Sequence, residues 1–320
     1  MQTAIFLGLV GAALWAGIPY ASAAEVDWTR AGFGLLAGTI AVSLAAWRTV
    51  ALAAGWRGAF RFLAATVALA WLAEVVGLEG GWLFGCAYRY SSALRPVLPG
   101  GVPLFIPLAW FSLAGIPVLL LHGWRTTRPD GSPDAVRTVA KAAWSALGMV
   151  ACDLALDPVA VSLGLWTWER PGPYFGVPWM NFAGWWLVSF LVFWAGYGWA
   201  FRTRAAEADL PLRHEAAWGV AHGALLVLLA VAVWNRAGSA GPLWLALAAM
   251  LPLSLFWLNR LHARIRAAGF GALRATRGGP GPRPDFSTVW KKVFHSVETP
   301  GHFFHTMEKV FAIFPHNGKN

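Results

Sequence analysis

The sequence predicts an all-α protein, a polytopic transmembrane helical bundle of about eight spans with a cytoplasmic amphipathic C-terminal tail. Two observations carry this prediction. The chain is 58% hydrophobic and only 12% charged, whereas soluble globular domains are about one quarter charged. Its apolar residues also form long uncharged stretches, and about 20 such residues are enough for one helix across a bilayer. Aperiodic glycines and the two cysteines exclude collagen-like chains and disulfide scaffolds.

The candidate spans follow one another along the chain. The uncharged ones cover residues 1–24, 31–47, 96–124, 171–201, 216–235 and 237–259. Two further stretches, 59–80 and 138–158, are equally apolar but contain acidic residues. The first span ends in Ala21-Ser22-Ala23-Ala24, which resembles a signal-peptide cleavage site. Because the basic region that normally begins a signal peptide is missing, we expect an uncleaved helix, and the remaining topology is the same in either case.

The basic residues predict the orientation of the helices. The connections after the second, fourth and sixth spans each carry three or four Lys or Arg residues, and the segment after Leu258 carries ten. The connections between them carry one or two. By the positive-inside rule, both termini are cytoplasmic and the loops 81–95 and 159–178 face the other side. We therefore expect a protein integral to the cytoplasmic (inner) membrane.

The C-terminal part differs from the rest, which predicts a transmembrane domain over residues 1–268 and a linker with a cytoplasmic tail over 269–320. Gly, Pro and Arg crowd between Arg274 and Pro284, as in linkers. An interfacial helix is then predicted by apolar residues at helical spacing, namely Phe303, Phe304, Met307, Val310, Phe311 and Phe314. His302, His305 and Glu308 share a face and could bind a metal, but a solvated helix face explains them better. We therefore expect no metal.

Four acidic residues interrupt predicted spans: Glu74 and Glu79 the third, and Asp153 and Asp157 the fifth. An Asp at the centre of a span costs about 2.5–3.5 kcal/mol, so a carboxyl group kept there is usually protonated, paired or functional. At 1.5 Å per residue, Glu74 and Asp153 both lie roughly 18–20 Å from the inner face. Asp153 and Asp157 share a helix face, whereas Glu74 and Glu79 diverge by about 140°. The sequence thus allows a shared acidic pocket.

A purely structural explanation of these acids stays open. They would then pair with Arg or with polar residues and only hold the bundle together. The nearby cations, Arg89, Arg95 and Arg170, all lie in predicted loops. Internal salt bridges are therefore not expected to neutralise every carboxyl group.

Both acidic spans are followed by segments rich in Gly, Pro and aromatic residues, 80–90 and 165–182. Broken helix ends at membrane depth are tolerated mainly where they line a cavity, and both segments lie on the side of the acids. Gly77, Gly81 and Gly85, spaced by four, also permit a close approach of helices. Any single one of the 21 tryptophans can instead belong to an interfacial belt, and this alternative stays open.

Six motifs follow one another between residues 70 and 190. They are Glu74-x-x-Gly77, Phe84-Gly85-x-x-Tyr88-x-Tyr90, Gly101-Val102-Pro103 with Leu108-Ala109-Trp110, Asp153-x-x-x-Asp157-Pro158, Trp166-x-Trp168, and Tyr174-x-Gly176-Val177-Pro178-x-x-Asn181-Phe182-x-Gly184-Trp185. In this combination the chain resembles the membrane carotenoid hydratases of the CruF type, which are carotenoid biosynthesis proteins. It departs from them at Gly80-Gly81-Trp82 and in the tail after Pro284.

The resemblance implies that water is added to the terminal 1,2 (or 1′,2′) double bond of an acyclic carotenoid end, with no cofactor. Residues of the observed types suit such a reaction. A neutral carboxylic acid can protonate the alkene, and burial favours the neutral form. Aromatic faces stabilise the resulting cation, and an ionised carboxylate can take a proton from the attacking water. The transmembrane domain, 1–268, would then be the catalytic one.

We expect Asp153, Asp157 and Glu74 to form the acid and base set, and which of them is the acid stays open. The resemblance implies a substrate pocket lined by Glu79, Phe84, Tyr88, Tyr90, Trp110, Trp166, Trp168, Tyr174, Asn181 and Trp185. The expected partners are a carotenoid substrate, either lycopene-like or another acyclic-ended polyene, membrane lipid and other carotenoid enzymes. Nucleic acid is not expected, because the basic residues lie at helix ends and form no stripe.

Two other functions remain compatible with the sequence. A non-catalytic carotenoid- or quinone-binding protein would use the same aromatic cavity without needing an acid. A proton-coupled transporter would also place acids in the membrane, but the two halves of the chain show no convincing repeat. His122 and His222 fall within predicted spans, and neither is assigned a role.

Overall fold

The computed structural model describes residues 28–201, 210–212, 214–215, 217 and 241–276. The predicted span 1–24, nearly all of 216–235, His222, and the linker and tail beyond residue 276 lie outside these residues. Residues 269–276, which were predicted to begin the linker, instead continue the helix Gly241–Thr276. The elements in chain order are α2 (Trp28–Gly80), β1 (Tyr88–Tyr90), η1 (Pro99–Gly101), α3 (Phe105–Leu120), α4 (Ala135–Ser162), β2 (Trp166–Trp168), α5 (Trp179–Ala195), the π-helix η2 (Gly196–Ala200) and α7 (Gly241–Thr276). The chain divides into two compact units, Met1–His262 and Ala263–Asn320, and the account below concerns the first.

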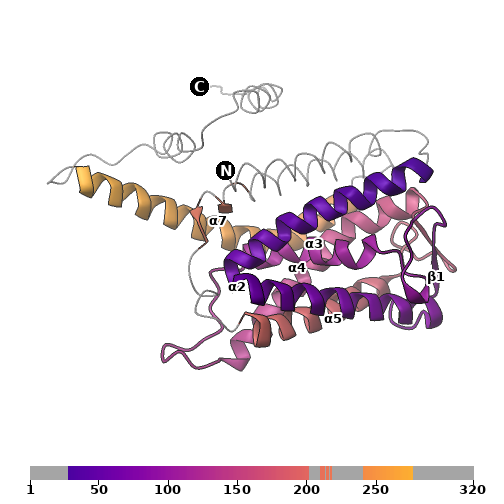
Figure 1. Ribbon diagram of the computed structural model, residues 1–320, viewed down its shortest axis with the longest axis horizontal. Helices are drawn as coiled ribbons and strands as arrows, with labels where there is room; N and C mark the ends of the chain where they lie inside the picture. The colour runs from indigo at the N-terminus through magenta and orange to yellow at the C-terminus, as the bar shows by residue number, and fades with distance from the viewer. Residues whose placement is uncertain (1–27, 202–209, 213, 216, 218–240, 277–320) are drawn as a thin grey trace, which may run out of the picture. The chain divides into compact units, whose positions relative to one another are not determined.

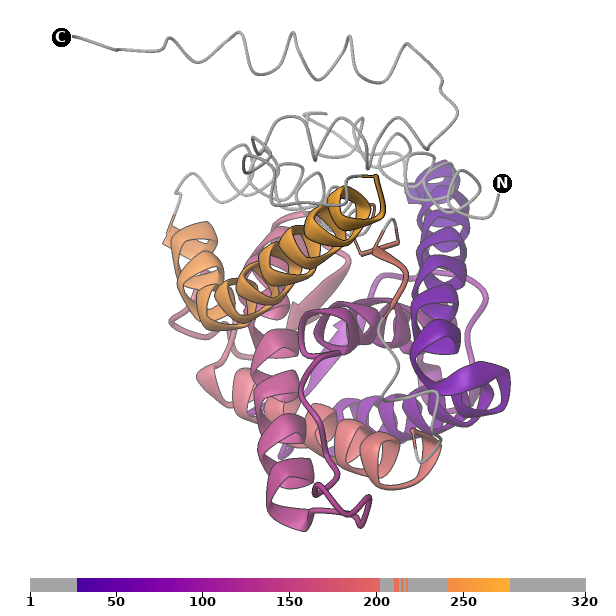
Figure 2. The ribbon, with the colours of Figure 1, turned by 90° about the vertical axis from the view of Figure 1, so that its left-hand side faces the viewer.

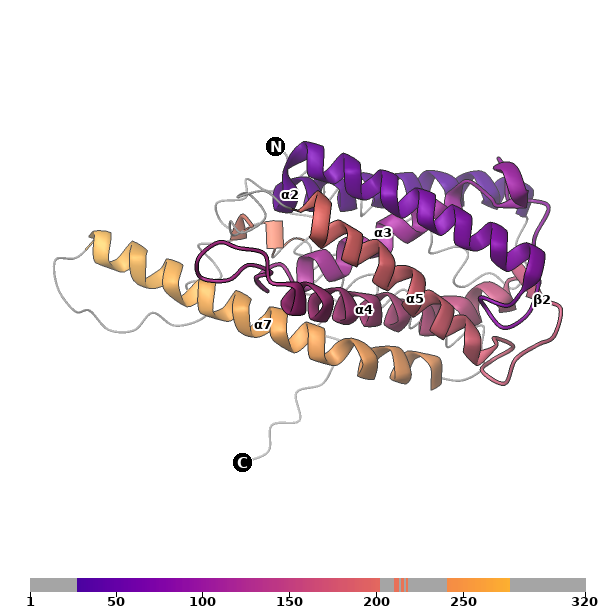
Figure 3. The ribbon, with the colours of Figure 1, turned by 90° about the horizontal axis from the view of Figure 1, so that it is seen from below.

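Helix α2 consists of two arms that meet at Gly55. This residue has φ 73° and ψ 165°, a left-handed conformation that glycine adopts without the penalty of a side chain. The chain reverses there, so the second arm runs back along the bundle (Figures 1 and 3). The two arms contain the second and third predicted spans, 31–47 and 59–80.

Three described helices are long and apolar enough to cross a membrane, judged by length and composition: Gly32–Gly80, Ala135–Ser162 and Trp244–Ala267. The first of these contains both arms of α2. The helix Phe105–Leu120 is apolar but shorter. The described part of the chain is therefore a membrane-type helical protein, and the predicted total of about eight spans stays a prediction.

The helices pack through small residues and aromatic rings. Helix α2 packs mainly against α3, and α4 packs mainly against α5 (Figure 2). The buried ring of Phe62 joins three elements, since its centroid lies 6.1 Å from that of Phe111 and 5.8 Å from that of Phe193. Ser43 and Ser112 share a buried hydrogen bond of 2.8 Å between α2 and α3. These contacts hold α2, α3 and α5 around one core.

Two predicted spans are wrong at their N-terminal ends. The stretch 96–124 forms a helix only from Phe105, and the stretch 171–201 only from Trp179. The residues before each helix are rich in Pro and Gly and form isolated bridges, Val97 with Pro103 and Tyr174 with Val177. Proline lacks the N–H group that a helix needs and disfavours helical geometry in the residue before it. Both helices therefore begin only after these segments.

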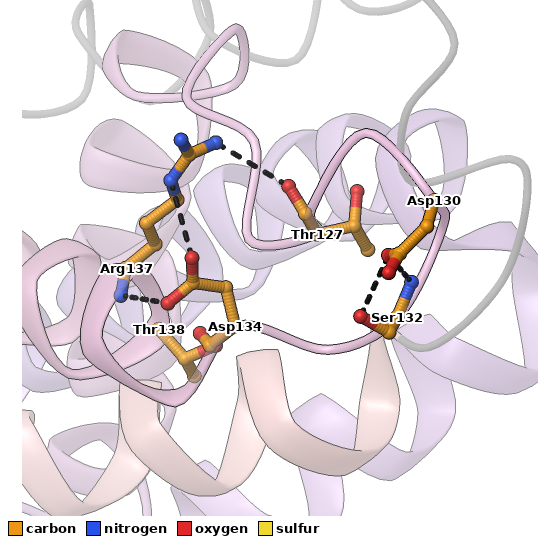
Figure 4. A network of polar contacts seen from close by, with 6 residues as sticks. All are labelled: Thr127, Asp130, Ser132, Asp134, Arg137 and Thr138. Carbon is orange, nitrogen blue, oxygen red and sulfur yellow. Dashed lines mark hydrogen bonds and ion pairs between the residues drawn. The ribbon is translucent and has the colours of Figure 1, made fainter.

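A polar turn precedes α4 (Figure 4). The side chain of Asp134 caps the helix by accepting from the Arg137 backbone N–H at 3.1 Å, and the Arg137 guanidinium lies 3.3 Å from the same carboxylate. Asp130 accepts from both the backbone and the hydroxyl of Ser132, at 2.9 and 2.7 Å. Such caps satisfy N–H groups at helix starts, which explains why α4 begins at Ala135, before the predicted residue 138.

The described residues are mostly helical, as predicted, but they also contain an antiparallel two-stranded ribbon that the sequence analysis did not predict. Strand β1, which follows α2, pairs with β2, which follows α4, in the register Tyr88 with Trp168, Arg89 with Thr167 and Tyr90 with Trp166. Side chains alternate between the two faces of a strand, and directly opposed residues share a face. Tyr88, Tyr90, Trp166 and Trp168 therefore occupy one face, and the exposed Arg89 and Thr167 the other. We call the first face the aromatic face of the ribbon.

Candidate functional site

Glu74 lies buried on the second arm of α2 and is held by three donors. Its Oε2 atom accepts from the hydroxyls of Tyr88 and Tyr90, the latter at 2.6 Å. Its Oε1 atom accepts from the Trp110 indole N–H at 3.1 Å. Burial, and after it the charge of Glu74, raises the pKa of both tyrosine hydroxyls well above its usual range. Both tyrosines therefore keep their protons and donate to the carboxyl group.

Asp153 and Asp157 lie on one face of α4 and are linked by a single amide. The Nδ2 atom of Asn181 donates to Asp153 at 2.9 Å and to Asp157 at 2.6 Å. A further donor, the Trp166 indole N–H, lies 2.6 Å from the second carboxyl oxygen of Asp157. Both aspartates are only 2% exposed. Asn181 is in the first turn of α5, so the start of this helix positions the amide that bridges the two aspartates.

A proline in α4 explains how the 171–178 segment is attached beside the aspartates. Pro158 has no N–H group, so the carbonyl of Leu154, four residues earlier, lacks its helical partner. The hydroxyl of Tyr174 donates to this carbonyl at 2.8 Å. The ring of Tyr174 also packs edge-on against Phe182 of α5, with centroids 5.1 Å apart. Tyr174 thus ties the segment to α4 and to the start of α5.

The aromatic face of the ribbon connects Glu74 of α2 with the aspartate pair of α4. Tyr90 packs against Trp166 with ring centroids 6.0 Å apart, and Tyr88 against Trp168 at 4.7 Å. Since Tyr90 donates to Glu74 and Trp166 donates to Asp157, this pair of rings connects the two carboxyl groups through a continuous chain of contacts. Glu74, Asp153 and Asp157 therefore belong to one polar cluster, which we call the carboxyl cluster.

The remaining predicted lining residues fall into two groups. The ring of Phe84 lies against two glycines, Gly77 of α2 and Gly184 of α5. A Cβ added at Gly77 would lie 2.5 Å from this ring, and one added at Gly184 would lie 2.6 Å from it. Both positions therefore require glycine for the close contact. Trp110, which bonds Glu74, stacks on Trp185 at 3.8 Å between centroids. Glu79, in contrast, is exposed near the end of α2. The structure thus brings together the predicted site residues other than Glu79, and the 140° divergence of Glu79 from Glu74 explains its separation.

The sequence reasoning assigned no role to two residues that shape this site. Gly184 appeared only as part of a motif, although a glycine in the first turns of an apolar helix is a signal for close contact. A proline inside a predicted helix, such as Pro158, likewise indicates that the carbonyl four residues earlier lacks its helical hydrogen bond. Both signals are visible in the sequence, but their partners, Phe84 and Tyr174, become evident only from the fold.

The ion pairs that the structure describes lie elsewhere. Arg89 pairs with Glu169 at 3.4 Å on the exposed side of the ribbon, Arg137 pairs with Asp134, and Arg260 pairs with Glu215. Within the described residues, none of these cations pairs with the carboxyl cluster, whose hydrogen bonds come from the neutral side chains of Tyr88, Tyr90, Trp110, Trp166 and Asn181. The same part of the chain contains no group of three or more His, Cys, Asp or Glu side chains placed to hold a metal ion.

Comparisons with known proteins agree with this picture. Residues 31–253 match the family described as carotenoid biosynthesis proteins. The chain is 38% identical over 130 residues to a bisanhydrobacterioruberin hydratase of Haloarcula japonica. This similarity covers 39% of the present chain and 41% of the relative, so less than half of the relative's length is matched. No solved structure matches the chain.

Proposed function

Because the chain belongs to the family of carotenoid biosynthesis proteins, we propose that it is a carotenoid hydratase. The membership confirms the resemblance seen in the motifs. The name of the relative, bisanhydrobacterioruberin hydratase, supports hydration as the reaction. The proposed substrate is an acyclic carotenoid end, which gains water across its terminal 1,2 (1′,2′) double bond without a cofactor.

The observation that carries the proposal is the bridge of Asn181 between Asp153 and Asp157. Two negative charges this close repel each other, and burial removes the water that would screen them. The pair is therefore expected to hold one proton, which leaves one carboxylic acid and one carboxylate side by side. An acid and a base of this kind are what hydration of an alkene requires.

The proposed reaction begins when the protonated aspartate transfers its proton to C2 of the terminal double bond. The π electrons form the new C–H bond and leave a tertiary cation at C1. A water oxygen then bonds to C1, and the carboxylate of the other aspartate takes up the proton that this water loses. The product is a tertiary alcohol, and the aspartate pair again holds a single proton.

The surrounding residues would assist this chemistry. Electron-rich ring faces attract cations. Tyr88 and Trp166 bond carboxyl groups of the cluster, and the ring of Trp168 packs on Tyr88. Glu74 completes the set in this proposal, since its bonds to Tyr88, Tyr90 and Trp110 orient these rings. The long apolar helices would keep the protein in the bilayer, where its lipid-soluble substrate and other carotenoid enzymes are found. We place it in the cytoplasmic membrane with both termini inside.

The test is expression in a lycopene-accumulating bacterium, followed by chromatography and mass spectrometry of the pigments. The intact protein should yield carotenoids that have gained water. Asp153→Asn and Asp157→Asn should lower hydration at least about 100-fold, the usual loss when an acid or base is removed, and Glu74→Gln should lower it as well. Asp130→Asn, in the exposed turn before α4 (Figure 4), is the control and should hydrate normally.

Two outcomes would contradict the proposal. Full hydration by all three variants would show that the carboxyl cluster performs no chemistry. Pigment that is bound by the intact protein but never hydrated would instead indicate a non-catalytic binding protein.

A further inference from the structure

The aromatic face of the ribbon carries one polar atom that the carboxyl cluster does not use. The hydroxyls of Tyr88 and Tyr90 bond Glu74, and the Trp166 N–H bonds Asp157. The fourth polar atom, Nε1 of Trp168, is buried and has no hydrogen-bond partner among the described residues. Trp168 is only 5% exposed, so bulk water does not satisfy this donor.

A donor in this position is unfavourable unless something binds it. A buried N–H without a partner costs about 1–3 kcal/mol, and buried polar groups are therefore bonded in the large majority of cases. Phenylalanine would fill most of the same space without this cost. The ring of Trp168 packs on Tyr88, with centroids 4.7 Å apart and planes inclined by 50°. An N–H contact with that ring would be a weak second-order interaction.

The chemistry of hydration indicates which molecule needs this donor. The alkene end of a carotenoid has no hydrogen-bond acceptor, so an N–H group gains nothing from the substrate. Water and the tertiary alcohol both offer an oxygen acceptor. The indole N–H is a donor only, whereas the aspartates of the cluster provide the acceptor for the proton that water loses.

We propose that the Trp168 N–H binds the oxygen atom that hydration adds, first as water and then as the product hydroxyl. This inference rests on the proposed function. A water molecule that accepts from Trp168 and donates to the carboxylate keeps one lone pair free to attack the cation. Holding reactants in this way is a large source of rate enhancement. The N–H keeps its proton throughout, so the atom balance of the reaction is unchanged.

The test removes the N–H while the ring remains. Trp168→Phe should lower kcat for hydration at least about tenfold, the equivalent of one lost hydrogen bond of about 1.4 kcal/mol. KM for the carotenoid should stay unchanged, because the alkene does not use this donor. Trp186→Phe is the matched control, since Trp186 is 38% exposed on α5 and stacks on Phe190; it should keep full activity.

A second variant covers the case in which Trp168→Phe does not fold. Benzothienylalanine incorporated at position 168 keeps the two fused rings and replaces the N–H by sulfur. It should fold and show the same loss of kcat. Wild-type kcat in this variant would overturn the inference, as would a loss of stability alone with normal kcat per folded molecule.

The result can be separated from that for the proposed function. If Asp153→Asn and Asp157→Asn abolish hydration while both Trp168 variants retain it, the hydratase proposal stands and the role of Trp168 is wrong. If the aspartate variants hydrate normally, the hydratase mechanism itself fails.

Discussion

Asn181 is the residue on which the geometry of the two aspartates depends. One amide nitrogen donates to both carboxyl groups, and the residue is only 3% exposed. Hydrogen bonds to charged groups are stronger than neutral ones, with net values of about 1.5–3 kcal/mol. Asn181 thus acts on the reaction through Asp153 and Asp157 and is a positioning residue.

The Asn181→Ala variant should therefore be both less stable and less active. We expect its free energy of unfolding to fall by about 1.5–3 kcal/mol, measured by denaturation in detergent, and hydration to fall at least tenfold. Ser189→Ala on the same helix is the control. The Ser189 hydroxyl is buried without a partner among the described residues, so its removal should leave stability unchanged or raise it. Equal stability of Asn181→Ala and the wild type would contradict the bridge.

At the scale of the elements, the site depends on how closely α5 approaches the segment that follows α2. Gly184 marks this contact, because a Cβ there would lie 2.5 Å from the Leu83 carbonyl oxygen and 2.6 Å from the Phe84 ring. Phe84 in turn packs edge-on against Tyr88 of β1, with centroids 6.1 Å apart. If α5 separated from this segment, Tyr88 would move away from Glu74, to which its hydroxyl donates. The start of α5, which carries Asn181, would move as well.

Gly184→Ala should lower stability by about 1–3 kcal/mol, as overpacking of a close contact usually does. Gly38→Ala is the matched control within α2, because a Cβ at Gly38 would meet nothing within 4 Å. It should be neutral or stabilise the helix by about 0.5–1 kcal/mol. Thermal unfolding of the two variants in the same detergent makes the comparison. A neutral Gly184→Ala would show that the two segments do not touch.

At the scale of the whole transmembrane unit, the two ends of the bundle differ. The ribbon and the segments 81–104 and 163–178 lie at one end, and the junction between the two arms of α2 lies with the turn before α4 at the other (Figure 1). At the second end, Arg57 lies over the ring of Trp56 and Arg61 over that of Trp199, both at 5.2 Å. These two tryptophans are 68% and 54% exposed, as expected of an interfacial belt.

The tryptophans thus divide between the two explanations that the sequence left open. Trp56, Trp82, Trp179 and Trp199 are more than half exposed and suit a belt. Four other tryptophans belong to the site. Trp110 and Trp166 bond carboxyl groups of the cluster, Trp185 stacks on Trp110, and Trp168 packs on Tyr88. Burial, which sequence composition does not report, separates the two groups.

The orientation of the bundle can be tested by cysteine labelling. With Cys86 and Cys152 replaced by serine, Ser92→Cys lies at the ribbon end and Arg128→Cys in the turn before α4. Because the basic residues predict a cytoplasmic turn, an impermeant maleimide should label Ser92→Cys in intact spheroplasts. Arg128→Cys should react only after permeabilisation. The reverse pattern would show that the site opens toward the cytoplasm.

The spacing of residues along the chain was sufficient to predict part of the candidate site. Asp153 and Asp157 could be placed on one face because four residues make about one helical turn. The separation of Glu74 from Glu79 followed from the same periodicity. The lengths of α3 and α5 were overestimated, because hydropathy does not distinguish an apolar helix from an apolar Pro-rich segment such as 96–104. The ribbon was missed for a related reason, since each strand has only three residues.

The sequence by itself determined the class of protein, the family and the helices that carry the acids, because composition, motifs and helical periodicity are all readable along the chain. Only the tertiary structure decided that β1 and β2 pair and that Asn181 bridges the two aspartates. It also decided that the N–H of Trp168 has no partner among the residues that the structure describes, while its three neighbours bind carboxyl groups. The physical reason is that these contacts join segments far apart in the chain, and their register depends on how the helices pack rather than on any local pattern.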